Sequence, residues 1–303
     1  MNKYFIITVD TEGDNLWNYK KGDQISTNNS LYIPRFQDLC ERYDFPPVYL
    51  TNYEMLCDDY YVSFIKQKHL NKLCEVGLHL HAWNNPPEYE LESMFTGNPY
   101  LIEYPDEVMR AKFDYIYKLF CDRMGFKPIS HRAGRWAMDK RYFKLLEDYD
   151  VLVDCSYTPL INWESNKGST RGGTDYSRCN NECHFVGHTF EVPLTVVNSR
   201  KPMGPSIRQN LRAVFLGKNL QLRPAIYSLH EMKYIVDKLY KSTTGDYIQF
   251  MLHSSELMPG GSPYFKDAGS IESLYSTLDV LFEYIHSKGF IGITLKEYYE
   301  QKK

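Results

Sequence analysis

Two histidines separated by one residue stand at the end of a short apolar segment. The segment covers residues 75–83, contains His79 and His81, and is followed by two prolines at positions 86 and 87. An apolar run closed by prolines is typical of a buried strand that enters a loop. Side chains two residues apart on a strand point to the same face, so the two imidazoles can bind one cation. Alternatively, they are two hydrogen-bonded histidines of the core.

Other polar side chains stand where further strands are predicted to end. Each of them alone has an ordinary structural explanation, such as a turn cap, a surface ion pair or a core histidine. The carboxyl ends of parallel strands, however, meet at one rim, where active sites are built. Their shared position favours a metal-hydrolase site over separate structural roles. Besides the two histidines, we assign to this rim Asp10, Glu12, Arg132, Asp154 and His253.

These residue types suit the hydrolysis of an amide or an ester. Two imidazoles and one carboxylate bind a divalent ion, for which zinc fits best, and leave positions open for a water and a carbonyl oxygen. Such an ion acidifies the water and polarises the carbonyl. A nearby carboxylate can take the proton of the water, and an arginine beside this carboxylate keeps it ionised. A histidine across the site can protonate the leaving amine.

Strands and helices alternate seven or eight times along the 303 residues. This order predicts the α/β class, with helices outside a parallel sheet of seven or eight strands that closes into a barrel. No repeat or linker divides the sequence, so we predict a single domain over residues 1–303. Gly125 is expected to end a helix, and Pro193 implies an edge strand or a strand break. The predicted strands cover 4–10, 47–51, 75–83, 128–132, 151–154, 189–197, 247–253 and 290–294, and the predicted helices cover 33–43, 54–72, 106–123, 139–147, 228–241, 271–288 and the end of the chain.

The composition narrows the class of protein. Hydrophobic residues make up 43% of the chain, which is enough for a substantial core, and the formal charge of -3 argues against nucleic acid as the main partner. No apolar run approaches the roughly 18 residues of a membrane span, and no charged and apolar leader precedes the first predicted strand. Seven scattered cysteines fit reduced thiols. The sequence therefore predicts a cytoplasmic protein without a transmembrane segment.

Five short motifs resemble, in chain order, those of the NodB-homology polysaccharide deacetylases, the fourth family of carbohydrate esterases. They are Thr8–Glu12, Gly77–His81, His131–Arg135, Asp154–Tyr157 and Leu252–Glu256, and the ending Gly289–Tyr298 is also similar to that family's last strand and helix. The match covers nearly the whole chain and looks closest to a branch associated with bacterial lipopolysaccharide and surface-glycan biosynthesis. The resemblance implies a distorted (β/α) barrel that removes acetyl groups from sugars with a divalent metal ion.

The resemblance also implies catalytic roles for individual residues. Asp10 is expected to act as the base, Arg132 to hold this base, and His253 to act as the acid. Asp154, which opens the fourth motif, is expected to join the catalytic set. The expected substrate is an N-acetylated, or alternatively O-acetylated, bacterial glycan or its lipid-linked precursor.

Two positions depart from the family pattern, and both concern the metal. Thr11 stands where that family has a second aspartate, and Trp83 stands where its second metal histidine would be, four residues beyond His79. Glu12 is the best replacement for the missing aspartate, because its side chain shares the strand face of Asp10. Glu12, His79 and His81 are therefore predicted to bind the metal, with zinc as the expected ion.

The two departures leave other functions open. The first alternative is a glycan-binding barrel that is catalytically weak or inactive. The second alternative keeps the hydrolase chemistry but changes the substrate to a small amide.

Further residues are candidates for supporting roles. Trp83 and Trp136 are expected either to stack on sugar faces together with Arg135, or to pack in the core. Segment 199–223 holds six lysines or arginines and no acid, which suggests either a site for lipid-linked phosphates or, more simply, a solvated basic surface. His131 and Glu256 are expected to support neighbouring site residues. A loose zinc-like spacing is formed by Cys179, Cys183, His184 and His188, although incidental thiols in a loop are the simpler interpretation.

Overall fold

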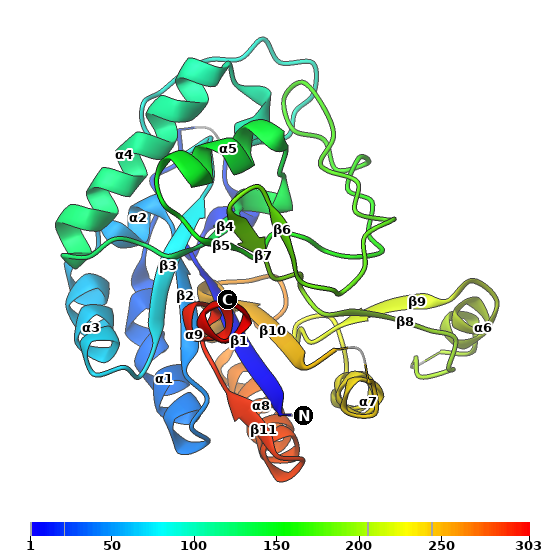
Figure 1. Ribbon diagram of the computed structural model, residues 1–303. Helices are drawn as coiled ribbons and strands as arrows, with labels where there is room; N and C mark the ends of the chain where they lie inside the picture. The colour runs from blue at the N-terminus through cyan, green and yellow to red at the C-terminus, as the bar shows by residue number, and fades with distance from the viewer. Residues whose placement is uncertain (1, 21, 205, 244) are drawn as a thin grey trace.

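A curled, mostly parallel sheet forms the centre of the molecule in the computed structural model, which describes residues 2–20, 22–204, 206–243 and 245–303 (Figure 1). The strand order is β10-β1-β2-β3-β4-β5-β7-β6, and β11 pairs with the start of β1. Only the pairing of β6 with β7 is antiparallel within this sheet, as far as the described residues go. The strands are β1 (Lys3–Thr11), β2 (Pro47–Thr51), β3 (Glu75–Leu80), β4 (Ser130–Ala133), β5 (Val153–Asp154), β6 (His184–Val186), β7 (Thr189–Glu191), β10 (Tyr247–His253) and β11 (Phe290–Gly292).

Helices cover the sheet and complete the predicted alternation (Figure 1). The α/β class and the distorted barrel are confirmed, because the parallel strands curl into a half-barrel with connecting helices outside it. None of the helices in the described part of the chain is long and apolar enough to cross a membrane. The helices are α1 (Ile33–Arg42), α2 (Tyr53–Leu56), α3 (Asp59–Leu70), α4 (Asp106–Met124), α5 (Lys140–Asp148), α6 (Ile207–Leu216), α7 (Leu229–Tyr240), α8 (Ala268–Ser287) and α9 (Leu295–Lys302).

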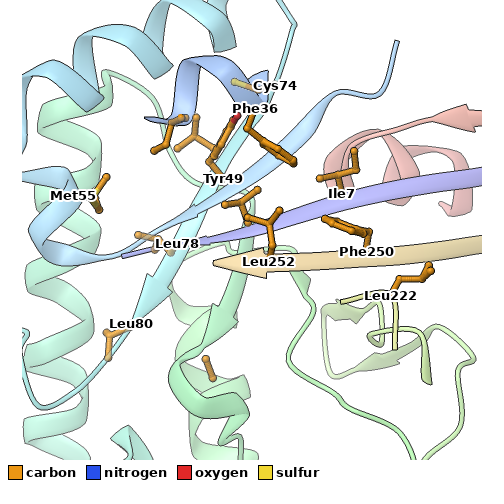
Figure 2. Packing of buried hydrophobic residues seen from close by; sticks show 14 of the residues in the cluster. Ile7, Phe36, Tyr49, Met55, Cys74, Leu78, Leu80, Leu222, Phe250 and Leu252 are labelled. Atoms are coloured by element: carbon orange, nitrogen blue, oxygen red, sulfur yellow. The ribbon is translucent and has the colours of Figure 1, made fainter. Parts of the chain in front are cut away.

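The central strands are buried over their whole length. Every residue of β2 and β3 is buried, as expected for parallel strands covered on both faces, and this explains their continuous apolar runs. Figure 2 shows side chains of these strands, such as Tyr49 and Leu78, packed beside Phe36 of α1 and Leu252 of β10. This core fixes the strands whose ends carry the polar side chains.

Two predicted boundaries are confirmed, and in each the residue type explains why the element ends. Gly125 ends α4 in the left-handed conformation, with φ of 80°, which costs glycine little. The chain leaves the sheet after Glu191, and the next strand, β8 (Val196–Ser199), pairs with β9 (Lys218–Gln221) in a separate antiparallel hairpin. The strand predicted over 189–197 is therefore broken around Pro193, which has no backbone N–H to donate.

Other elements differ from the prediction. The single helix expected over 54–72 is two helices, because Asp58 accepts a hydrogen bond from the Tyr61 backbone N–H at 2.9 Å and starts α3 anew. Segment 199–223, for which no element was predicted, contains α6 and β9. The apolar residues of α6 alternate with Arg208, Arg212 and polar side chains, so the sequence displays the basic charge of this segment more clearly than its helical spacing.

Candidate active site

A cavity of about 390 Å³ opens at the carboxyl ends of β1, β3 and β10. Eight of the ten predicted site residues line it, as their positions at strand ends and in the following loops require. Arg132 and Asp154 do not line it. The lining residues are Asp10, Glu12, Leu16, Trp17, His79, His81, Trp83, Asn98, Tyr100, Arg135, Trp136, Trp163, Asn166, Arg223 and His253.

Glu12, His79 and His81 converge in this cavity, and each of them offers a ligand atom within 4.8 Å of the others. His81 Nε2 lies 2.8 Å from Glu12 Oε2 and 3.2 Å from His79 Nε2. All three side chains are buried. Two imidazoles and a carboxylate that face one another in this way match the donor set of a divalent cation.

The hydrogen bond made by the other nitrogen of His79 orients its ring. Nδ1 lies 2.9 Å from the carbonyl oxygen of Arg132, which can only accept, so Nδ1 carries the proton. The other ring nitrogen, Nε2, faces the cluster and lies 3.6 Å from Glu12 Oε2. Burial would raise the pKa of the Glu12 carboxyl, but hydrogen bonds from His79 and His81 hold that pKa well below its ordinary value. The carboxyl is therefore ionised and available as a ligand.

Gly134 lets the backbone after β4 approach the cluster closely. A Cβ atom at this position would lie 2.5 Å from the Leu80 carbonyl oxygen and 2.6 Å from His81 Nδ1. Only a residue without a side chain leaves the His81 ring in its place. Close packing against His81 and Leu80 therefore explains why a glycine stands at position 134, in the third motif.

Asp10 forms the predicted ion pair with Arg132. The guanidinium Nη1 lies 2.5 Å from Asp10 Oδ1, and Arg132 is fully buried. Arg132 also donates to Thr8 Oγ1 at 2.9 Å and to the Cys155 carbonyl oxygen at 3.2 Å. Burial would raise the pKa of the Asp10 carboxyl, but the charge of Arg132 lowers it below its ordinary value. Asp10 is thus a charged carboxylate at the cavity wall with its second oxygen, Oδ2, unclaimed by the arginine.

Asp154 lies below the site instead of within it. Its Oδ1 accepts a hydrogen bond from His131 Nδ1 at 2.7 Å, and His131 Nε2 lies 2.8 Å from the Tyr142 hydroxyl. All three side chains are fully buried. The expectation that Asp154 belongs with the catalytic side chains is therefore corrected, because its position allows it to order β4 and β5 but not to touch a bound molecule. His131 has the supporting position that was expected of it.

His253 stands opposite the cluster. Its Nε2 lies 3.9 Å from Asp10 Oδ2 and 3.9 Å from Glu12 Oε1. Its Nδ1 lies 3.2 Å from Arg223 Nη2 and 3.4 Å from Glu256 Oε1. Because arginine donates and a carboxylate accepts, Nδ1 has a partner in either protonation state. Glu256 is buried behind His253, as the sequence predicted.

Aromatic side chains form the walls of the cavity. Trp136 stacks on Trp163 with ring centroids 5.2 Å apart, and the Arg135 guanidinium lies 4.2 Å above the Tyr100 ring. Arg135 and Trp136 are consecutive residues with φ of 54° and 56°, a left-handed conformation that is uncommon outside glycine and is found at functional sites. Trp83 also lines the wall. The three predicted substrate-binding residues thus all line the cavity, and Trp136 also packs in a core cluster with Tyr176, Leu194 and Met251.

The sequence did not identify six polar or aromatic residues of the wall. The five in long loops have no periodic pattern, and only their aromatic or amide character could have suggested them. Arg223 was noted only as part of a basic segment. These residues are Trp17, Asn98, Tyr100, Trp163, Asn166 and Arg223.

The loose cysteine and histidine spacing does not form a second metal site. Cys183 Sγ lies 3.8 Å from the Tyr298 hydroxyl, and His184 Nδ1 lies 3.0 Å from the Glu182 carbonyl oxygen. Across the described residues, Glu12, His79 and His81 are the one group of three or more suitable side chains close enough to hold an ion. The simpler interpretation of the thiols of Cys179 and Cys183 as incidental therefore holds, although His184 belongs to strand β6 and not to a loop.

Comparisons with known proteins identify the fold. Neither the family models nor the sequences of curated proteins gave a match. A protein of Parabacteroides distasonis described as a glycoside hydrolase/deacetylase has a similar structure, with a TM-score of 0.62, 10% identity, and coverage of 99% of this chain and 70% of that chain. One of Mycobacterium smegmatis described as a polysaccharide deacetylase has a TM-score of 0.50 and 12% identity, covering 96% and 93%.

The 4-alpha-glucanotransferase of Thermococcus litoralis is also similar, with a TM-score of 0.58 and 11% identity. The match covers 99% of this chain but 41% of that enzyme, so the likeness concerns one part of a longer protein. At such low identities a structural likeness establishes the fold alone. The chain therefore has the α/β fold, with a curled parallel half-barrel, that these three proteins share.

Proposed function

We propose that the chain is a metal-dependent deacetylase of an acetylated glycan. The proposal rests on one juxtaposition: the cluster of Glu12, His79 and His81 shares a cavity with the ionised Asp10 and with His253. Two proteins that are described as deacetylases have the same fold, which supports the proposal. We extend it to an N-acetylated, or alternatively O-acetylated, bacterial surface glycan or its lipid-linked precursor. This extension follows the resemblance of the five motifs.

The residues present fit a divalent ion, and we propose zinc. Glu12, His79 and His81 would hold it, because their ligand atoms already face one another and the carboxyl is ionised. When bound, such an ion lowers the pKa of a water molecule and polarises a carbonyl oxygen. Thr11, one residue from Asp10, points to the other face of β1, where its buried hydroxyl donates to the Val9 carbonyl oxygen at 3.0 Å.

The proton transfers are assigned to the chain's own side chains. Asp10 Oδ2 takes a proton from the attacking water, while Arg132 holds Oδ1 and keeps the carboxylate charged. The oxygen of this water bonds to the acetyl carbon as the bond from that carbon to the sugar nitrogen, or sugar oxygen, breaks. His253 Nε2 gives a proton to the leaving atom from the opposite side. The products are acetate and the free amine or hydroxyl.

The cavity walls are assigned to substrate binding. The rings of Trp83, Trp136, Trp163 and Tyr100 provide flat apolar surfaces of the kind on which sugar rings stack. We also propose that residues 1–303 act as one catalytic domain, and that the protein works in the cytoplasm. All seven cysteines are free, which is consistent with a reducing compartment.

Release of acetate from a panel of N-acetylated and O-acetylated glycans, with small amides included, tests the proposal. We expect turnover with zinc, loss of turnover after chelation, and recovery when zinc is returned. Asp10→Asn should abolish turnover, whereas Asp279→Asn, at an exposed ion pair, should not. If the metal-loaded protein releases no acetate from any member of the panel, the proposal fails.

A glycan-binding barrel without catalysis is the second candidate. Trp83 favours it, because an aromatic ring that lies 5.5 Å from the His81 ring stands where the resemblance places a metal histidine. Such a protein would bind glycans equally well with and without zinc and would release no acetate. Isothermal titration with the same glycans, before and after chelation, separates the two functions.

A further inference from the structure

Helix α6 lies at the end of an arm formed by β8 and β9, apart from the helices around the sheet (Figure 1). Of its ten residues, all of which the structure describes, only Ala213 is buried. Apolar side chains elsewhere in the molecule mostly enter the core, so an element with this degree of exposure needs another explanation.

The exposed side chains of α6 form an apolar stripe. Ile207, Leu211, Val214 and Phe215 follow the spacing that brings residues to one helical face, and their exposed fractions are 80%, 54%, 41% and 73%. Leu216, at 73%, extends the apolar surface at the end of the helix. The stripe points to water and not to the rest of the protein.

Positive charge surrounds this stripe. Arg208 and Arg212 lie on α6 itself and are exposed, and both neighbour the stripe because they stand three residues before Leu211 and Phe215. Segment 199–223 contains six lysines or arginines and no acid, of which Arg223 lies in the wall of the active-site cavity. Beside α6, Lys201, Arg212, Lys218 and Glu231 line a cavity of about 350 Å³, in which Lys218 pairs with Glu231 at 2.5 Å. The arm thus combines an apolar stripe with cationic flanks, which is the pattern of helices that lie in the surface of an anionic bilayer.

We propose that α6 is a membrane-surface helix that docks the protein on anionic lipid. The apolar stripe enters the boundary between headgroups and acyl chains, and the flanking cations face the lipid phosphates. This inference concerns a different part of the molecule from the cavity that carries the proposed function.

A second copy of the chain fits the stripe less well. Two copies meeting through this surface would bring the exposed Arg208 and Arg212 of one copy toward those of the other. A ten-residue helix is also only about 15 Å long. One face of such a helix offers far less than the roughly 800 Å² per partner of a standard protein interface. Charge and area therefore both favour lipid.

Co-sedimentation of the full chain with lipid vesicles tests the proposal. One vesicle set contains phosphatidylcholine alone, and the other contains one part phosphatidylglycerol to three parts phosphatidylcholine. We expect binding to the anionic vesicles, with binding that weakens as salt is added. The triple variant Ile207→Ser, Leu211→Ser, Phe215→Ser should bind at least about tenfold more weakly. Arg208→Gln and Arg212→Gln should each weaken binding about fivefold.

Matched variants separate the arm from general surface effects. Leu31→Ser, Leu70→Ser and Met94→Ser remove three other apolar side chains that are at least as exposed as Leu211, and should leave vesicle binding unchanged. Circular dichroism shows whether each variant is folded. Equal vesicle binding by the two triple variants would overturn the proposal, as would binding that does not depend on phosphatidylglycerol. A dimer in sedimentation velocity that the α6 variant abolishes would assign the stripe to a second copy instead. Because no turnover is measured, these outcomes do not depend on the proposed deacetylase activity.

Discussion

Two carboxylates that reach the cavity differ in the side chains with which they pair. Asp10 and Glu12 are two residues apart in the chain at the end of β1, and both reach the cavity, but their partners differ. Arg132 holds Asp10, whereas His81 faces Glu12. An arginine keeps a carboxylate charged without competing for a metal ion, so this pairing suits a base. The imidazole partners of Glu12 suit a shared ligand set.

The first prediction separates these roles by metal binding. His81→Ala should bind zinc at least about 10–100-fold more weakly, since it removes a ligand. Asp10→Asn should retain zinc and lose about 10²–10⁴-fold in turnover, since it removes the base. Isothermal titration with zinc and the acetate assay measure the two effects. Loss of zinc by Asp10→Asn together with its retention by Glu12→Gln would invert the assignment.

Glu54 carries a second prediction, which concerns stability. Its buried carboxyl accepts hydrogen bonds from the Gly13 N–H at 2.8 Å, from Asn52 Nδ2 at 3.2 Å and from Asn84 Nδ2 at 2.9 Å. Burial nevertheless raises the pKa of Glu54 from 4.5 to about 7. The folded state therefore holds this proton more tightly than the unfolded state does. The resulting stabilisation is complete below about pH 4.5 and is lost as the pH rises through about 7.

Glu54→Gln should remove this pH dependence, because the amide does not titrate. Asn84 Oδ1 has no hydrogen-bond partner among the described residues, so a rotated Asn84 amide can accept from the amide that this substitution introduces. Urea unfolding with chelator present, at a series of pH values, should show the variant gaining about 3 kcal/mol relative to the parent between pH 4.5 and well above pH 7. The exposed Glu300→Gln serves as the control. Parallel curves for parent and Glu54→Gln would contradict the prediction.

A substitution where the ends of β3 and β4 meet tests how the backbone positions His81, a predicted metal-binding residue. Gly134→Ala would place its Cβ atom 2.6 Å from His81 Nδ1 and 2.5 Å from the Leu80 carbonyl oxygen, so the backbone must shift. We expect a loss of about 1–3 kcal/mol in the free energy of unfolding, because overpacking displaces neighbours. Zinc affinity should fall with it, since the His81 ring moves.

Gly269→Ala in α8 is the matched control, because its Cβ atom would meet its nearest neighbour at an ordinary 3.5 Å. Urea unfolding and zinc titration are measured on both variants. If Gly134→Ala binds zinc as tightly as the parent does, the ring of His81 is not held by this backbone contact.

The elements also show where sequence patterns carry information. The ends of β1, β3 and β10 were predictable, because buried strands leave continuous apolar runs and the polar residues after them are conspicuous. Asp154 was misplaced because a motif does not tell whether a strand-end side chain faces the cavity or the layer beneath it. Trp163 and Asn166 reach the cavity through a long loop whose path depends on packing between distant segments. Helix α6 was not predicted, because charged residues stand between its apolar ones and make the helical spacing less evident.

The molecule as a whole should not need its metal to fold. The ligands come from the ends of β1 and β3, two strands of the sheet that a large apolar core already fixes. Zinc at about a hundredfold excess over its Kd should add about 2.7 kcal/mol to stability and raise Tm by about 5 °C. Calorimetry of the parent and His81→Ala checks this, and the variant should show no shift. Unfolding of the parent by chelator alone would show that the metal organises the sheet.

The strands of the parallel sheet and the loops between them contribute different parts of the cavity. Asp10, His79 and His253 are carried by strands of the central sheet, whereas the aromatic wall comes from the segments between the strands and helices. Insertions or exchanges in those loops can redraw the shape of the cavity while the reacting groups keep their spacing. The architecture is therefore modular: a new ligand preference can be acquired by rebuilding the loops, without redesigning the chemistry.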